Sequence, residues 1–253
     1  MMPVHYEVFG AGPPLVMLHG WAMHGGVWRD FAMRLGQHYQ VIVIDLPGHG
    51  LSGISTPFDL EYLSQALLQA IPVTEFTVLG WSMGATLALA LVERCPERIK
   101  RVIVLSGNPC FIQLDDWPGM NAEVFGAFSA LLDRGVSQTL TRFLALQVNG
   151  LEQGKVWLQD LKHALQTRPM PSEDTLRAGL RLLQHSDLRH AIQRAAIPIC
   201  FILGDRDHLV PISLAQRVAR DYPGISVFIL EQAGHVAFLS HAERLLEILI
   251  GEL

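Results

Sequence analysis

A serine between two glycines, at a point where the sequence changes from strand-like to helix-like, most constrains how this chain folds. Residues 80–84 read Gly80-Trp81-Ser82-Met83-Gly84. A short apolar run precedes them at residues 77–79, and helix-forming residues follow at residues 85–92. Small residues are needed on both sides of such a turn because a side chain there would collide as the chain doubles back. The pattern predicts a strand, a tight turn and a helix, with Ser82 on the turn as a candidate nucleophile.

Strand-like and helix-like segments alternate in both terminal parts of the chain. Uninterrupted apolar runs such as residues 41–44 suit strands that helices cover on both faces. The alternation predicts an α/β fold with a mostly parallel, doubly wound sheet. The predicted strands are residues 4–9, 14–18, 40–45, 76–79, 101–105, 197–203 and 226–230, and the predicted helices are residues 27–35, 61–70, 83–95, 214–221 and 242–249.

The alternation stops between residues 111 and 186, where the sequence has helical periodicity and almost no strand signal. We expect residues 1–110 and 187–253 to form one α/β core, and residues 111–186 to form a helical cap inserted into it. Ligands of open α/β sheets bind at the carboxyl ends of the strands. A cap over that edge would enclose a binding site.

The composition is that of a globular protein, with 50% hydrophobic and 17% charged residues among 253. The formal net charge of −5 provides no attraction to nucleic acid. No apolar run reaches the roughly 18 residues of a membrane helix, and the N-terminus lacks the pattern of a signal peptide. The cysteines Cys95, Cys110 and Cys200 have no regular spacing, which predicts reduced thiols. We expect a cytoplasmic monomer that binds neither nucleic acid nor membrane.

A serine hydroxyl becomes nucleophilic when a base removes its proton and an acid orients that base. Asp207 and His235 each follow a predicted strand, in the order serine, acid, histidine that strand–turn–helix hydrolases have. Asp207 is preferred to Asp205, which directly follows a glycine and is better placed to cap the loop. The alternatives, that both aspartates form a turn and that His235 is a surface histidine, remain open.

Two backbone amides are candidates for holding an oxyanion beside Ser82. Met83 begins the predicted helix, so its N–H points to that position. Trp21 follows a predicted strand through His19-Gly20, and its N–H can face the same point, whereas His19 itself is expected to be structural. The tight turn at residues 45–52 has no lysine beside its glycines, so we interpret it as scaffold and not as a phosphate loop.

No group of histidines and carboxylates has the spacing of metal ligands, and no G-x-G-x-x-G follows a strand. We therefore expect no metal and no nucleotide cofactor.

These motifs together resemble those of the α/β-hydrolases over the full length of the chain. They are His19-Gly20, Asp45-x-Pro47-Gly48-His49-Gly50-x-Ser52, Gly80-x-Ser82-x-Gly84, Gly204-x-x-Asp207 and Gly234-His235. Trp81 and segments of the expected cap, among them Asp116-Trp117-Pro118-Gly119-Met120 and residues 142–147 and 168–171, closely resemble the biotin-pathway carboxylesterases that demethylate pimeloyl-acyl-carrier-protein methyl ester.

The resemblance implies a serine carboxylesterase that forms an acyl-enzyme and hydrolyses that methyl ester, with acyl-carrier protein as the partner. It also implies that the acyl chain lies under the cap. The positions that match substrate contacts of that family are Trp21, Ser82, Met83, Phe143, Leu144, Ala145, Leu146, Gln147 and His235.

In the same family, arginines on the cap hold the acidic helix of the carrier protein. Arg142 matches one of these arginines and Lys155 keeps the charge at another, but Gln138 and Gln159 replace arginine. Residues 134–168 hold five basic and two acidic side chains, which predicts a local basic patch; the alternative is a solvated helix face.

Two alternative functions remain at this stage. A general short- or medium-chain carboxylesterase, or a carbon–carbon bond hydrolase, would use the same three residues. A ligand-binding receptor with this fold would hold its ligand and hydrolyse it slowly.

Overall fold

The computed structural model describes residues 3–53 and 56–252, and its centre is a seven-stranded sheet with the order β1-β3-β2-β4-β5-β6-β7. β1 runs antiparallel to β3, and the other neighbours are parallel. This confirms the predicted α/β class and mostly parallel sheet. The strands are β1 (Tyr6–Phe9), β2 (Pro14–Leu18), β3 (Gln40–Ile44), β4 (Phe76–Trp81), β5 (Ile99–Leu105), β6 (Ile199–Gly204) and β7 (Ser226–Leu230).

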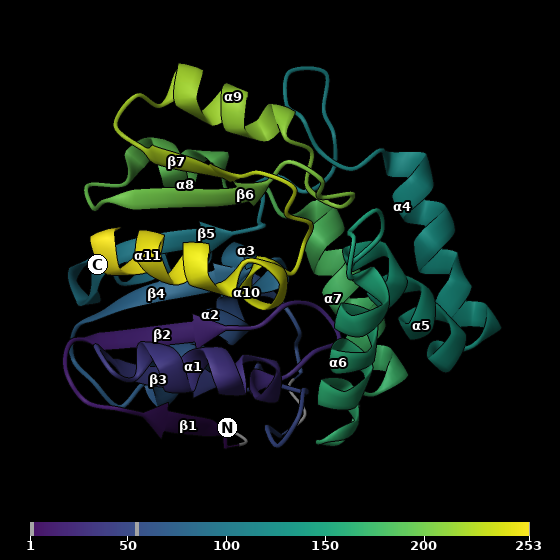
Figure 1. The fold of residues 1–253 in the computed structure, drawn as a ribbon, viewed down its shortest axis with the longest axis horizontal. Coiled ribbons are helices and arrows are strands. Elements are labelled where there is room, and N and C mark those ends of the chain that lie inside the picture. The colour runs from purple at the N-terminus through teal and green to yellow at the C-terminus, as the bar shows by residue number, and fades with distance from the viewer. Residues whose placement is uncertain (1–2, 54–55, 253) are drawn as a thin grey trace.

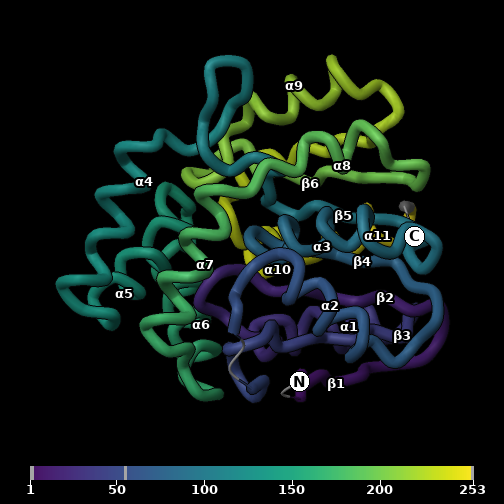
Figure 2. Tube along the Cα trace, turned by 180° about the vertical axis from the view of Figure 1, so that it is seen from behind, coloured from purple at the N-terminus to yellow at the C-terminus, as the bar shows by residue number. Residues whose placement is uncertain are grey.

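Helices cover both faces of the sheet, as the doubly wound prediction requires (Figure 1). α1 and α11 lie on one face, and Arg34 of α1 pairs with Glu243 of α11 at 2.5 Å. α2, α3 and α8 lie on the other face (Figure 2). The bounds are α1 (Arg29–Leu35), α2 (Leu60–Ala70), α3 (Met83–Arg94), α8 (Arg189–Arg194), α9 (Ser213–Asp221), α10 (Ala237–Ser240) and α11 (Ala242–Glu252), with short 3₁₀ turns η1 (Gly25–Trp28) and η2 (Pro96–Arg98).

Residues 111–186 contribute no strand to the sheet and form helices beside the carboxyl ends of its parallel strands (Figure 1). α7 shows why they fold there, because Leu176, Leu180 and Leu183 are spaced to share one face and all three are buried. The elements are α4 (Ala122–Ser129), η3 (Ala130–Arg134), α5 (Val136–Gln147), α6 (Gly154–Gln166) and α7 (Glu173–His185).

The turn between β4 and α3 has almost no free space. Ser82 has φ 56° and ψ −120°, a backbone conformation that costs a non-glycine residue energy. A Cβ added to Gly80 would lie 2.3 Å from the carbonyl oxygen of Gly84, and one added to Gly84 would lie 2.3 Å from that of Leu18. The two glycines therefore let α3 turn back tightly against both β4 and β2.

β4 continues two residues beyond its predicted end. Gly80 and Trp81 pair with Val104 and Leu105 of β5, so the strand runs directly into the turn. The added pairing fixes the backbone up to Ser82, whose N–H donates to the carbonyl of Leu105 at 3.1 Å.

Within the described part of the chain, no helix combines the length and apolar composition needed to cross a bilayer.

We expect Gly80→Ala to lower the free energy of unfolding by about 3 kcal/mol, because the new methyl group overlaps Gly84 and Ala85. The matched control is Gly126→Ala on α4, where an added Cβ meets nothing within 4 Å. That change should raise stability by up to about 1 kcal/mol through helix propensity. Urea unfolding of both variants measures the difference, and equal stabilities would contradict the steric argument.

Candidate active site

Three loops meet at the carboxyl edge of the sheet. Ser82 lies on the turn after β4, Asp207 follows β6, and His235 follows β7. Because β4, β5, β6 and β7 are successive parallel neighbours, the loops that follow them open at the same edge. The sheet order thus brings together residues that are more than a hundred positions apart in sequence.

Asp207 and His235 form the central hydrogen bond of the site. Nδ1 of His235 donates to Oδ2 of Asp207 at 2.7 Å. The second oxygen, Oδ1, accepts the backbone N–H groups of Leu209 at 2.8 Å and Val210 at 3.1 Å. The carboxylate is therefore fixed on both oxygens and determines the orientation of the imidazole. Asp205, by contrast, is exposed.

The other imidazole nitrogen of His235 is available for chemistry. Because Nδ1 donates to a carboxylate, Nε2 is the nitrogen with a lone pair. Nε2 is buried and has no hydrogen-bond partner among residues 3–53 and 56–252. Ser82, 9% exposed, lies on the wall of an apolar pocket and directly follows Trp81, whose ring centroid lies 5.7 Å from that of His235. A buried imidazole acceptor next to this segment is suited to general-base catalysis.

The loop after β2 runs directly beside Ser82. A Cβ added to Gly20 would lie 3.1 Å from the Cβ of Ser82, so the backbone leading into Trp21 reaches the serine. Met83 supplies the first amide of α3, which has no acceptor within its own helix. The backbone segments that contain Trp21 and Met83, the residues predicted to be oxyanion donors, therefore both lie next to Ser82.

His19 connects the loops after β2 and β3. Its Nδ1 donates to the carbonyl of Gly20 at 2.8 Å, and its Nε2 accepts the N–H of Leu46 at 2.9 Å. Burial lowers the pKa of His19 to about 3, and burial likewise lowers the pKa of its neighbour His49 to about 4. Both imidazoles are therefore neutral, and His19 has the structural role expected from its sequence position.

An apolar pocket extends from Ser82 into the helices of residues 111–186. The indole of Trp21 packs edge-on against Phe143 at 4.8 Å between ring centroids and donates to the carbonyl of Leu176 at 2.9 Å. Within the predicted acyl-contact stretch, Phe143 and Leu146 line the pocket. The full lining is Trp21, Ser82, Phe111, Met120, Val124, Phe125, Phe128, Phe143, Leu146, Leu180, Leu183 and Leu209.

Three residues of that stretch lie elsewhere. Leu144 is a core residue, 2% exposed, and Ala145 is only half-buried; neither lines the pocket. Gln147 is buried at the end of α5, where its backbone carbonyl accepts the N–H of His235 at 3.3 Å. Gln147 therefore touches the histidine loop and not the apolar pocket.

Sequence reasoning missed most of the pocket wall. Phe125 and Phe128 are three residues apart on α4, and Leu180 and Leu183 repeat that spacing on α7. This apolar periodicity was detectable, but it predicts only a buried face. Which buried face contacts substrate depends on how the helices pack on the sheet.

The basic patch is smaller than the count of charges predicts. Arg142 and Lys155 are exposed, on α5 and α6 respectively. Arg168 is not part of the surface patch, because its guanidinium donates to both oxygens of the buried Asp45 at 2.8 Å and also pairs with Glu7.

The carboxylate of Asp45 is an attachment point for several loops. Besides Arg168 it accepts the N–H groups of Gly25 at 2.6 Å and Leu51 at 2.8 Å. Burial alone would raise the pKa of Asp45, but the nearby His19, the two amides and the guanidinium together outweigh burial and lower it. The expected scaffold turn at residues 45–52 is thus held by a charged group that also reaches residue 168.

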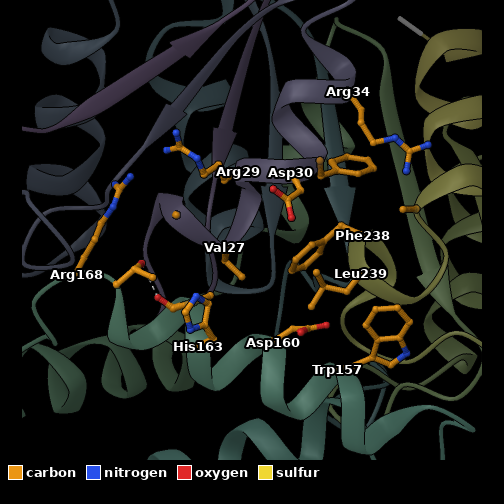
Figure 3. A pocket seen from close by; sticks show the side chains of 15 residues that line it. Val27, Arg29, Asp30, Arg34, Trp157, Asp160, His163, Arg168, Phe238 and Leu239 are labelled. Carbon is orange, nitrogen blue, oxygen red and sulfur yellow. Dashed lines mark hydrogen bonds between the residues drawn. The ribbon is translucent and has the colours of Figure 1, made fainter.

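A second, polar groove lies between α1, α6 and α10 (Figure 3). α1 contributes Arg29, Asp30 and Arg34, and α6 contributes Asp160 and His163. None of Ser82, Asp207 and His235 lines this groove.

Across the described residues, no cluster of three or more His, Cys, Asp or Glu side chains is placed to bind a metal ion.

Comparisons with known proteins agree with this geometry. A sequence profile described as "alpha/beta hydrolase fold" matches residues 13–242. An esterase from Exiguobacterium antarcticum superposes with a TM-score of 0.88 at 23% identity, over 99% of this chain and 95% of its own. An enol-lactonase from Burkholderia xenovorans LB400 superposes with a TM-score of 0.83 at 19% identity, over 99% of this chain and 96% of its own. The chain belongs to the α/β-hydrolase fold family.

Two curated relatives identify a smaller family within the α/β-hydrolases. Pimeloyl-acyl-carrier-protein methyl ester esterase from Aeromonas salmonicida (strain A449) is 37% identical over 249 residues, 98% of either chain. The enzyme of that name from Nitrosomonas europaea is 38% identical over 248 residues, 96% of this chain and 97% of its own. At this identity over nearly its whole length, the chain belongs to the same family as these esterases.

The buried imidazoles predict a loss of stability in acid. His19 and His49 have folded pKa values of about 3 and about 4, below the ordinary value of 6.5, so the unfolded chain takes up protons first as the pH falls. We expect the free energy of unfolding to be about 4 kcal/mol lower at pH 5 than at pH 7.5. His49→Gln should remove about half of that difference. Urea titrations at pH 5 and pH 7.5 measure the two free energies of unfolding. Equal values at the two pH values would contradict the conclusion that the buried imidazoles are neutral.

Proposed function

We propose that this protein hydrolyses the methyl ester of pimeloyl-acyl-carrier protein with Ser82 as nucleophile, His235 as base and Asp207 as the orienting acid. The observation that carries the proposal is the 2.7 Å hydrogen bond from His235 to Asp207, with Nε2 of His235 buried and without a hydrogen-bond partner among the described residues. The substrate is inferred from the pimeloyl-acyl-carrier-protein methyl ester esterases that are 37–38% identical to the chain.

In the first half-reaction, Oγ of Ser82 attacks the ester carbonyl carbon while Nε2 of His235 takes the hydroxyl proton. The backbone N–H groups of Met83 and Trp21 hold the resulting oxyanion. Collapse of the tetrahedral intermediate breaks the bond to the methoxy oxygen, and His235 returns its proton to form methanol.

In the second half-reaction, water attacks the acyl-enzyme and gives its proton to Nε2 of His235. Cleavage of the bond to Oγ releases the carboxylic acid, and the proton returns to Ser82. Asp207 holds the productive tautomer throughout and stabilises the imidazolium. The net reaction consumes one ester and one water and forms one acid and one methanol.

Residues 111–186 act as a cap in this proposal. The methylene chain of the substrate occupies the apolar pocket between Trp21, Phe143 and Leu146, where burial of each CH₂ contributes about 0.8 kcal/mol. The exposed Arg142 and Lys155 lie on the same group of helices and attract the acidic carrier protein.

The test of the triad is turnover of pimeloyl-acyl-carrier-protein methyl ester, with a p-nitrophenyl acyl ester as second substrate. Ser82→Ala should lower kcat by about 10⁴- to 10⁶-fold, and Asp207→Asn by about 10⁴-fold because it allows the wrong imidazole tautomer.

Matched controls come from the same residue types. Ser64→Ala, on α2, and Asp205→Asn, two residues before Asp207, should keep kcat within about twofold of the unchanged protein. Esterase activity that survives Ser82→Ala would overturn the assignment of the nucleophile.

The carrier contact predicts a different kinetic signature. Arg142→Glu combined with Lys155→Glu should raise KM for the carrier-linked ester about tenfold at low salt, and less at high salt, because exposed charges steer an acidic partner. KM for the p-nitrophenyl ester should stay unchanged. Arg220→Glu, an exposed charge on α9, is the control. A KM for the carrier-linked ester that does not move would contradict this docking site.

A further inference from the structure

His235 lies in a loop, so contacts and not secondary structure must hold its imidazole. The loop connects β7 to α10, and Gln232 within it adopts a positive φ of 61°. The backbone N–H of His235 donates to the carbonyl of Gln147. The backbone carbonyl of His235 has a partner from the other side, the indole of Trp81.

Trp81 is the residue immediately before Ser82 on β4. Its Nε1 donates to the carbonyl oxygen of His235 at 2.8 Å, across 154 positions of sequence. The indole is 1% exposed, and its ring centroid lies 5.7 Å from the imidazole of His235. The bond therefore joins the strand that carries the nucleophile to the backbone of the base.

We propose that Trp81 is a positioning residue, whose indole N–H holds the imidazole of His235 at a fixed position relative to Ser82. The inference rests on the proposed ester hydrolysis and adds a role within it for a residue that touches no substrate. Because Trp81 ends β4 and Ser82 follows it directly, any movement of this strand end moves the serine and the backbone of the histidine together.

The geometry favours an oriented contact over simple packing. Nε1 of Trp81 reaches a single carbonyl, while the indole face is supported edge-on by Phe238 at 4.9 Å and by Trp28 at 5.9 Å. Phe238 also lines the polar groove (Figure 3). Losing the N–H frees the carbonyl of His235 without emptying the cluster.

Trp28 provides the matched comparison. It is fully buried in the same aromatic cluster, 4.4 Å from Phe238 between ring centroids. Its Nε1 is buried with no hydrogen-bond partner within the described residues. Replacing either tryptophan by phenylalanine removes one indole from the cluster, but only at Trp81 does the change remove a hydrogen bond to His235.

The experiment compares Trp81→Phe with Trp28→Phe on a p-nitrophenyl acyl ester. We expect Trp81→Phe to lower kcat by about 10- to 100-fold with KM within about twofold, since small misplacements of a catalytic group cost this much. Trp28→Phe should leave kcat within about twofold. Thermal unfolding of both variants, followed by circular dichroism, shows how far each change affects stability alone.

A second readout does not depend on activity. The proton of His235 Nδ1, hydrogen-bonded to Asp207, gives a far-downfield proton NMR signal that should shift or broaden in Trp81→Phe and stay in place in Trp28→Phe. An unchanged signal together with equal kcat values in the two variants would overturn the proposal. If the unchanged protein hydrolyses no ester, the proposed function fails, while the NMR comparison still decides the role of Trp81.

A variant that does not fold would not end the test. The pair Trp81→Met and Trp28→Met repeats the comparison with a flexible side chain that fills irregular space. Retention of the downfield signal and of full kcat in Trp81→Met would again count against the proposal.

Discussion

The close approach of three backbone segments around Ser82 is the constraint on which the rest of the site depends. Gly84 lets α3 lie against the carbonyl of Leu18, and Gly20 lets the loop after β2 lie against Ser82. Both approaches bring backbone from other segments against Ser82, as the proposed oxyanion role of Met83 and Trp21 requires. The cost is a strained φ of 56° at Ser82, which the pairing of β4 with β5 sustains.

The histidine loop is held from both parts of the molecule. Asp207 and Trp81 reach His235 from loops and strands of the sheet, and Gln147 reaches it from the last turn of α5. Three hydrogen bonds thus replace the secondary structure that the loop lacks. Because the bond to Gln147 comes from the helices that form the apolar pocket, movement of those helices would shift the imidazole of His235.

A charged contact provides another link between the same parts. Arg168, just after α6, donates to Asp45, which also accepts the N–H of Gly25 at the start of η1, a few residues after Trp21. The arginine is 10% exposed at its side chain and the aspartate is fully buried. A buried pair of this kind adds little net stability, but breaking it leaves an unpaired buried charge. Its main effect is therefore to fix geometry.

The α/β class, the approximate position of every strand and the tight turn at Ser82 were predictable from the sequence, because apolar periodicity and glycine sterics are local properties. The sequence also placed Asp207 and His235 after strands, in an order that a parallel sheet brings to one edge. The internal pairing of Arg168 and the set of side chains that line the pocket emerge only from the tertiary structure. The contact of Arg168 with Asp45 spans 123 positions, and the pocket is built from several separate segments. Local sequence patterns do not distinguish among the buried side chains, because the packing of these segments decides which of them face the pocket.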